Sequence, residues 1–150
     1  MVVIIAGSRS FTDITLVRRA VDASGWRQSI QLLITGGARG IDSLAEPYAR
    51  EQRLPIVTIP AGWANISVPG AVVKRNARGP YNAAAGMQRN EAMALRAIEK
   101  GRSRQCAAGL VLIWDGTSSG SANMRRTALR HRLQLFEFVP TDYGARTCRG

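Results

Sequence analysis

The chain has 150 residues, which is enough for one domain with a hydrophobic core, and its 45% hydrophobic content excludes a disordered polypeptide. No apolar run reaches the roughly 18 residues of a membrane span, and no basic region precedes the N-terminal run as in a signal peptide. We therefore expect a cytoplasmic protein without membrane contact. The net charge of +11 is uneven, with +2 in residues 1–60 and +9 in residues 61–150. This bias is consistent with an anionic partner or with a solubilising surface.

The cysteines and the histidine give no sign of a metal site. Cys106 and Cys148 lie far apart in the sequence, and the chain has a single histidine. Neither a disulfide framework nor a zinc site is indicated by this spacing. We expect no metal and no cofactor.

The first half of the chain alternates between apolar runs and helical patterns. In order, it predicts a strand at 2–6, a helix at 13–24, a strand at 31–35, a helix that begins at Ile41 and a strand at 55–60. Asp13 suits a helix start, where the helix dipole favours negative charge. Pro47 lies inside the second helix, and we expect it to kink or shorten that helix.

The second half resumes the alternation after a gap. It predicts a helix at 88–101, a strand at 109–114, a helix at 120–132 and a strand at 133–139. Apolar strands separated by amphipathic helices favour a single α/β, Rossmann-like domain. We expect a mostly parallel sheet of about five strands with helices on both faces, over residues 1–139. Residues 140–150 are expected to form a tail.

The gap spans residues 61–87, where no element is evident. Its only charges are Lys74, Arg75 and Arg78, all positive. A loop of this length in a small domain is usually functional or disordered. A lid over an anionic ligand and a mobile insertion are both consistent with it.

Three turns rich in Gly and Ser follow predicted strands and precede predicted helices. They read AGSRS from Ala6, TGGARG from Thr35 and DGTSSGS from Asp115. Glycine lets backbone approach a ligand, and free N–H groups at a helix start attract anions. In open α/β sheets such turns meet at the carboxyl ends of the strands. We expect a nucleotide or sugar-phosphate pocket there, with simple turn chemistry as the alternative.

Several familiar sites are missing from the sequence. It has no Gly-Lys-Ser/Thr and no G-x-G-x-x-G, and no acidic residue closes the second or third strand. A P-loop and an ordinary NAD site are therefore disfavoured. The absence of G-x-S-x-G removes support for a hydrolase triad.

Four motifs in this order, IIAGSRSFTD, ITGGARGIDSLAEPYA, AAGMQRNEAMA and IWDGTSSGSANM, resemble small YspA-like proteins of the SLOG superfamily. That superfamily includes the phosphoribohydrolase LOG and the DNA-processing protein DprA (Smf). The resemblance implies a Rossmann-like fold with a nucleotide-type pocket at the strand ends. By position, the ligand-binding residues would be Gly7, Ser8, Arg9, Gly36, Gly37, Arg39, Arg89, Asn90, Gly116, Ser119, Gly120 and Ser121.

The residues available for catalysis differ from those of LOG-type enzymes. Their PGGxGTxxE glutamate aligns with Met124, which cannot act as an acid or base and is expected to pack against the sheet. Asp42 and Asp115 are the catalytic candidates. Asp42 equally suits the helix dipole, and Asp115 begins an ordinary DG turn.

Two functions remain from the sequence. One is a nucleotide-type pocket used for sensing or for hydrolysis of an N-glycosidic bond, with Trp63 or Tyr81 as a surface for base stacking. The other is a DprA-like nucleic-acid-binding module that uses the basic C-terminal half, including RRTALRHR at 125–132. Because LOG-like relatives form dimers, a homodimer through a helix face is also expected.

Overall fold

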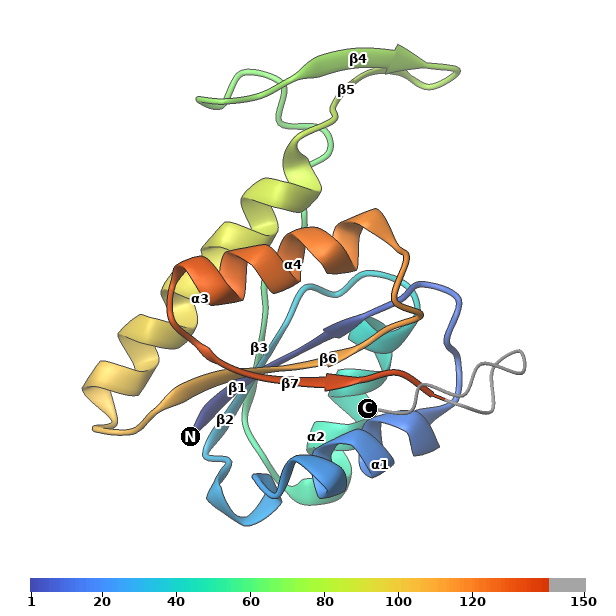
Figure 1. Ribbon diagram of the computed structural model, residues 1–150. Helices are drawn as coiled ribbons and strands as arrows, with labels where there is room; N and C mark the ends of the chain where they lie inside the picture. Colours follow the sequence, from blue (N-terminus) through green and yellow to red (C-terminus); the bar gives the residue numbers. More distant parts are fainter. Residues whose placement is uncertain (141–150) are drawn as a thin grey trace.

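Five parallel strands form the central sheet of the computed structural model, which describes residues 1–140 (Figure 1). The expected tail therefore lies outside the described residues except for Pro140. The strands are β1 (Val2–Gly7), β2 (Leu32–Thr35), β3 (Ile56–Thr58), β6 (Ala108–Ile113) and β7 (Gln134–Phe138), in the order β3-β2-β1-β6-β7. This confirms the predicted five-stranded α/β sheet.

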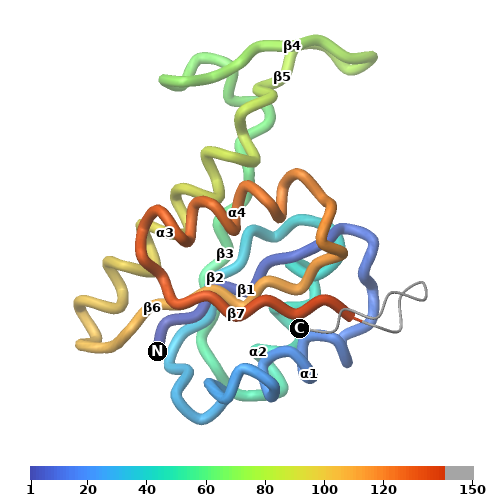
Figure 2. Tube along the Cα trace, in the orientation of Figure 1, coloured from blue at the N-terminus to red at the C-terminus, as the bar shows by residue number. Residues whose placement is uncertain are grey.

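Helices cover both faces of the sheet, as predicted (Figure 2). On one face lie α1 (Ile14–Ser24) and α2 (Ile41–Gln52), and on the other α3 (Ala85–Ser103) and α4 (Ser119–Arg130). A short 3₁₀ turn, η1, spans Arg27–Ser29. Side chains alternate across a strand, so Val3 and Ile5 of β1 join the core under α1 and α2. Val2 and Ile4 join the core under α3 and α4.

Local chemistry explains where the first two helices begin and continue. Asp13 caps α1 by accepting a hydrogen bond from the Thr15 N–H at 2.9 Å. Pro47 does not shorten α2, which continues to Gln52. Tyr48 and Ala49 directly follow the proline and are buried in the core. Their packing holds the second half of α2 against the sheet and offsets the backbone hydrogen bond that Pro47 cannot donate.

The segment 61–87 contains structure that the sequence analysis did not predict. Two short antiparallel strands, β4 (Val73–Asn76) and β5 (Gly79–Asn82), form a hairpin, and α3 begins at Ala85. The expectation of 27 residues without an element was therefore wrong. Residues of β4 are all exposed, so the hairpin lacks the apolar alternation by which a half-buried strand is recognised.

The order of the strands in the sheet determines where a crevice for a ligand can form. Chain order runs outward from β1 through β2 to β3 on one side, and from β1 to β6 and β7 on the other. The order therefore reverses between β1 and β6. At such a switch point the loops that follow the two strands diverge and leave a crevice at the carboxyl edge of the sheet.

Candidate functional site

A pocket of about 630 Å³ lies at this switch point, between the turns that follow β1 and β6 and the start of α3. Ten of the predicted site residues line it: Gly7, Ser8, Arg9, Asp42, Arg89, Asn90, Asp115, Ser119, Gly120 and Ser121. Gly36, Gly37, Arg39 and Gly116 do not line it. The pocket thus combines the first and third glycine-rich turns, whereas the TGGARG turn contributes only Ala38 and the following Asp42.

Ser8 joins the two turns on either side of the crevice. Its side chain is buried, and its Oγ accepts a hydrogen bond from the Asp115 N–H at 3.1 Å. The same hydroxyl lies 3.3 Å from the Ser118 Oγ. The Ser8 N–H donates to the Ile113 carbonyl at 3.0 Å. These bonds fix the position of the loop after β6 relative to the end of β1.

The fold itself requires glycine at the three glycine positions of the TGGARG turn, without any ligand. A Cβ on Gly36 would lie 2.4 Å from the Arg89 Nη1 and 2.6 Å from the Asp42 Oδ2. Gly40 has a φ of +80°, and a Cβ there would lie 2.3 Å from the Ser8 carbonyl oxygen. Gly37 also has a positive φ, +68°. The turn therefore needs glycine both for its backbone conformation and for close packing.

The backbone N–H groups near this turn face an anion that belongs to the chain itself. The backbone N–H groups of Ala38, Gly7 and Gly36 act on the carboxylate of Asp42, in the first turn of α2, and favour its ionised form. Asp42 is buried, with 4% of its surface exposed. Part of the polarity of this turn thus acts on an internal carboxylate and not on a ligand.

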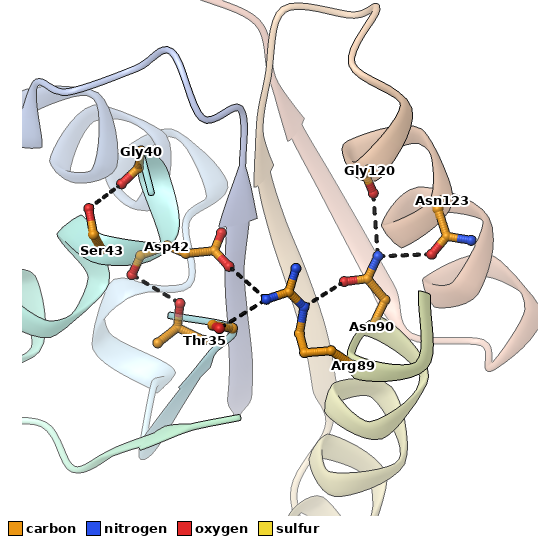
Figure 3. A network of polar contacts seen from close by, with 9 residues as sticks. Thr35, Gly40, Asp42, Ser43, Arg89, Asn90, Gly120 and Asn123 are labelled. Carbon is orange, nitrogen blue, oxygen red and sulfur yellow. Dashed lines mark hydrogen bonds and ion pairs between the residues drawn. The ribbon is translucent and has the colours of Figure 1, made fainter. Parts of the chain in front are cut away.

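Asp42 is paired with Arg89 of α3, which reaches it from the opposite face of the sheet (Figure 3). The Arg89 Nη1 lies 3.9 Å from the Asp42 Oδ2 and donates to the Gly36 carbonyl at 2.9 Å. Burial raises the pKa of Asp42 above its ordinary value, although Arg89 and the three N–H groups oppose that shift. Burial likewise lowers the pKa of Arg89, an effect that Asp42 opposes and nearby Arg9 reinforces.

The polar network continues from Arg89 to α4. The Arg89 Nε donates to the Asn90 Oδ1 at 3.1 Å. The Asn90 Nδ2 in turn donates to the Asn123 Oδ1 at 2.8 Å and, at 3.4 Å, to the Gly120 carbonyl (Figure 3). Asn90 is not a helix cap, because α3 begins five residues earlier at Ala85. It positions α4 relative to the Asp42–Arg89 pair.

Asp115 organises the loop before α4. Its Oδ1 accepts hydrogen bonds from the N–H groups of Thr117 and Ser118, each at 2.9 Å. The bond from Thr117 holds the pKa of Asp115 below its ordinary value, against the opposing effect of burial. This carboxyl group therefore remains ionised and serves the loop in the way of an Asx turn.

The start of α4 faces the pocket without an acidic side chain. Its first turn contains no Asp or Glu, and no side chain caps its N-terminal amides. Ser119, Gly120 and Ser121 line the pocket there, together with Arg126 of the same helix. Positive charge from Arg9 and Arg126 and the helix dipole thus act on the same space.

Several pocket residues were not predicted as site residues. Asn123, Met87 and Arg126 line the pocket but lie outside the glycine-rich turns, and Ser118 lies within the DGTSSGS turn but was not named as a ligand-binding residue. Helical spacing from Ser119 identifies Asn123 and Arg126 as neighbours of the first turn. Trp63 also lines the pocket and is 42% exposed. Its ring lies against Gly86, where an added Cβ would be 3.5 Å from the indole.

Met124 has the buried position that the sequence analysis expected. It is 1% exposed and belongs to the core between the sheet and the helices α3 and α4. Its side chain also forms part of the pocket lining. The site consequently has no carboxylate at the position of the LOG-type glutamate.

Other classes of site receive no support from residues 1–140. Within this range no group of three or more His, Cys, Asp or Glu side chains is arranged to hold a metal ion. No helix in the described part combines the length and apolar character that crossing a membrane requires.

Comparisons with known proteins agree with the resemblance. Residues 1–65 match the model of the YspA, cpYpsA-related SLOG family, which confirms the resemblance over the part of the chain that holds the first two motifs. No curated protein matches the chain in sequence. A crystal structure of DNA processing protein A (DprA) from Streptococcus pneumoniae is similar over 89% of this chain, with 14% identity and a TM-score of 0.41. The aligned region covers 57% of the DprA chain.

The buried pair generates the first prediction. Replacing Arg89 by Met leaves the Asp42 carboxylate buried without its cation, and we expect the free energy of unfolding to fall by about 3 kcal/mol at pH 7. The pKa of Asp42 then rises further above its unfolded value. Stability linked to such a group is present at low pH and lost as pH rises, so the deficit should shrink between pH 7 and pH 5. Urea denaturation at both pH values measures this.

Two further variants make the result specific. Adding Asp42→Asn to Arg89→Met should recover part of the loss, because the unpaired charge is removed. Arg39→Met is the matched control, since it removes an exposed arginine from the TGGARG turn, which Arg89 contacts at Gly36. A deficit for Arg89→Met that does not change with pH, or a double variant no more stable than Arg89→Met, would contradict this account.

Proposed function

We propose, from the match of residues 1–65 to a SLOG family and from the pocket at the switch point, that this protein binds a nucleotide or nucleotide-derived ligand. The observation that carries the proposal is the junction of two glycine- and serine-rich turns with the uncapped start of α4. A phosphate would accept hydrogen bonds from the amides at Ser119 to Ser121. Arg9 and Arg126 would compensate its charge.

The charges around the pocket support an anionic ligand. Two carboxylates line it, but Asp42 and Asp115 are each engaged by backbone N–H groups of the chain. Arg9 lines the same pocket and acts electrostatically on Arg89. A bound anion would relieve the repulsion between these two guanidinium groups. At the other end, the exposed Trp63 offers a face on which a base could stack.

Cleavage of an N-glycosidic bond is the second candidate, and Asp42 favours it. Asp42 lines the pocket, and burial raises the pKa of its carboxyl group above the ordinary value, which favours holding a proton. Arg89 beside it would stabilise the ionised form after a proton is given up. Asp115 is proposed for loop structure and not for proton transfer, because its pKa lies below the ordinary value.

The helix arginines give the nucleic-acid alternative little support. Within 125–132, Arg125 is paired with Glu137, and Arg130 and His131 are paired with Glu91. Arg126 belongs to the pocket. Two of the four arginines of this segment are thus compensated inside the chain, and these two would gain little from phosphates.

A homodimer through α3 and α4 is proposed from their exposed leucines. Leu95 is 51% and Leu129 is 49% exposed. Leu95 follows Glu91 by one helical turn, and Leu129 directly precedes the Arg130 that pairs with Glu91. Both leucines are thus close in sequence to the Glu91–Arg130 contact that joins the two helices, and a second copy that packs there would bury them.

Ligand binding is tested by calorimetry with adenosine 5′-monophosphate, ADP-ribose and adenosine. We expect both phosphate-bearing compounds to bind and adenosine to bind much more weakly. Arg9→Ala and Arg126→Ala should each cost about 1.5–3 kcal/mol of binding free energy, the range of a hydrogen bond to a charged group. Arg39→Ala is the matched control and should bind normally. No binding across the set would refute the proposal, and a loss confined to Arg39→Ala would place the phosphate at the TGGARG turn instead.

Turnover is tested by chromatographic detection of free base released from nucleoside 5′-monophosphates. If the pocket cleaves the glycosidic bond, Asp42→Asn should abolish release, provided that circular dichroism and nucleotide binding show the variant to be folded with its pocket intact. Asp115→Asn should keep most of the activity once its folding is verified. An intact protein that binds the nucleotide and releases no base would eliminate the hydrolase candidate and leave binding as the function.

The dimer is tested by light scattering. The chain of 16.3 kDa should elute with about twice that mass, and replacing both Leu95 and Leu129 by Arg should return the mass of one chain. Replacing the exposed Val68 of the long loop by Arg is the control and should leave the mass unchanged. A mass of one chain for the unaltered protein would refute this interface.

A further inference from the structure

The β4–β5 hairpin, here called the arm (residues 73–82), stands away from the sheet beyond the start of α3 (Figure 1). Its strands pair only with each other. The pairing sets Lys74 opposite Tyr81 and Arg75 opposite Pro80, and the two central residues of its turn are Ala77 and Arg78. The pocket described above does not include these residues.

The arm is strongly cationic. Lys74, Arg75 and Arg78 are exposed, and none forms an ion pair with another residue of the described range 1–140. The sequence contains no Asp or Glu from residue 52 to residue 90. The arm therefore presents three uncompensated charges within a few residues, unlike the helix arginines of α4.

The base of the arm is rigidly held. Asn82 is fully buried, and its Oδ1 accepts hydrogen bonds from the N–H groups of Val72 and Ala84. Its Nδ2 donates to the Gln88 side chain at 2.8 Å, and Gln88 donates to the Pro69 carbonyl. The Asn82 N–H donates to the Trp63 carbonyl at 2.7 Å. These bonds attach the exposed ribbon to the start of α3 and to the loop before it.

We propose that the arm binds duplex DNA by lying in the major groove. Two paired strands are about 4.8 Å apart, and with their side chains they fill a groove about 12 Å wide. Lys74, Arg75 and Arg78 then reach phosphates on the groove walls. The deep, narrow major groove of duplex RNA does not admit such a ribbon. Single-stranded DNA is disfavoured because Tyr81 is the only aromatic side chain of the arm, whereas stacking platforms use several.

A second copy of the chain is a poorer partner for the arm. Two arms would bring six cations together, and Pro80 removes a backbone donor from β5. Charged residues and proline are the features by which natural edge strands avoid pairing with another strand. Charge complementarity thus favours a polyanion over self-association. The inference is independent of the proposed pocket function, because it concerns different residues.

The test is fluorescence anisotropy with a labelled 20-base-pair DNA duplex, its single strand and the matching RNA duplex, from 50 to 200 mM salt. We expect the protein to prefer the DNA duplex. With three phosphate contacts, affinity should fall about 40-fold over this salt range, from a slope of about 0.9 per contact. Replacing Lys74, Arg75 and Arg78 by Ala should abolish most of that salt dependence and weaken binding at 50 mM salt more than 10-fold.

The matched control replaces three exposed arginines elsewhere, Arg50, Arg102 and Arg104, by Ala and so removes the same charge. Both triple variants should keep the thermal unfolding midpoint, because the altered side chains are exposed. Equal losses of DNA affinity in the two triple variants would mean that only the net charge of the protein matters, and this result would overturn the proposal. Preference for single strands or RNA, or an arm-dependent dimer without DNA binding, would overturn it as well. Loss of nucleotide binding in the pocket variants would not affect this result.

Discussion

The buried pair of Asp42 and Arg89 holds the two sides of this site together. Asp42 belongs to α2 on one face of the sheet, and Arg89 belongs to α3 on the other. Their side chains meet beyond the carboxyl ends of the strands, under Gly36. Burying one of these charges alone would be costly, so each requires the other to be in place. The pair thereby couples the positions of helices that share no direct packing across the sheet.

The pair also decides which turn is available to a ligand. In the TGGARG turn, the N–H groups of Gly36 and Ala38 act on the Asp42 carboxylate and favour its ionised form. The amides at the start of α4 have no such internal anion in the first turn. The network from Arg89 through Asn90 to Asn123 sets where those amides lie. A glycine-rich turn is therefore not by itself an anion site in this fold. The groups that surround its backbone N–H groups decide whether an anion can bind there.

Compensation of charge, and not the number of cations, separates the surfaces of the molecule. The net charge of the second half of the chain is high throughout. On α4, however, Arg125 and Arg130 are paired with Glu137 and Glu91. The arm has no acidic residue near it in the sequence or in the described ion pairs. A surface of this kind interacts with distant anions more strongly than one whose charges are locally neutralised.

The sequence by itself determined the sheet, the helices on both faces and ten of the residues that line the pocket. Buried strands and amphipathic helices are encoded by local periodicity, and the carboxyl ends of parallel strands must share one edge. It did not reveal the hairpin, because the exposed residues of β4 show no alternation. Nor did it show that Arg39 lies outside the pocket or that the buried Asp42 pairs with Arg89. Those outcomes depend on contacts between residues as far apart in the sequence as Gly36 and Arg89. The spacing of residues in the sequence does not tell which hydrogen-bond partners such groups find in the folded protein.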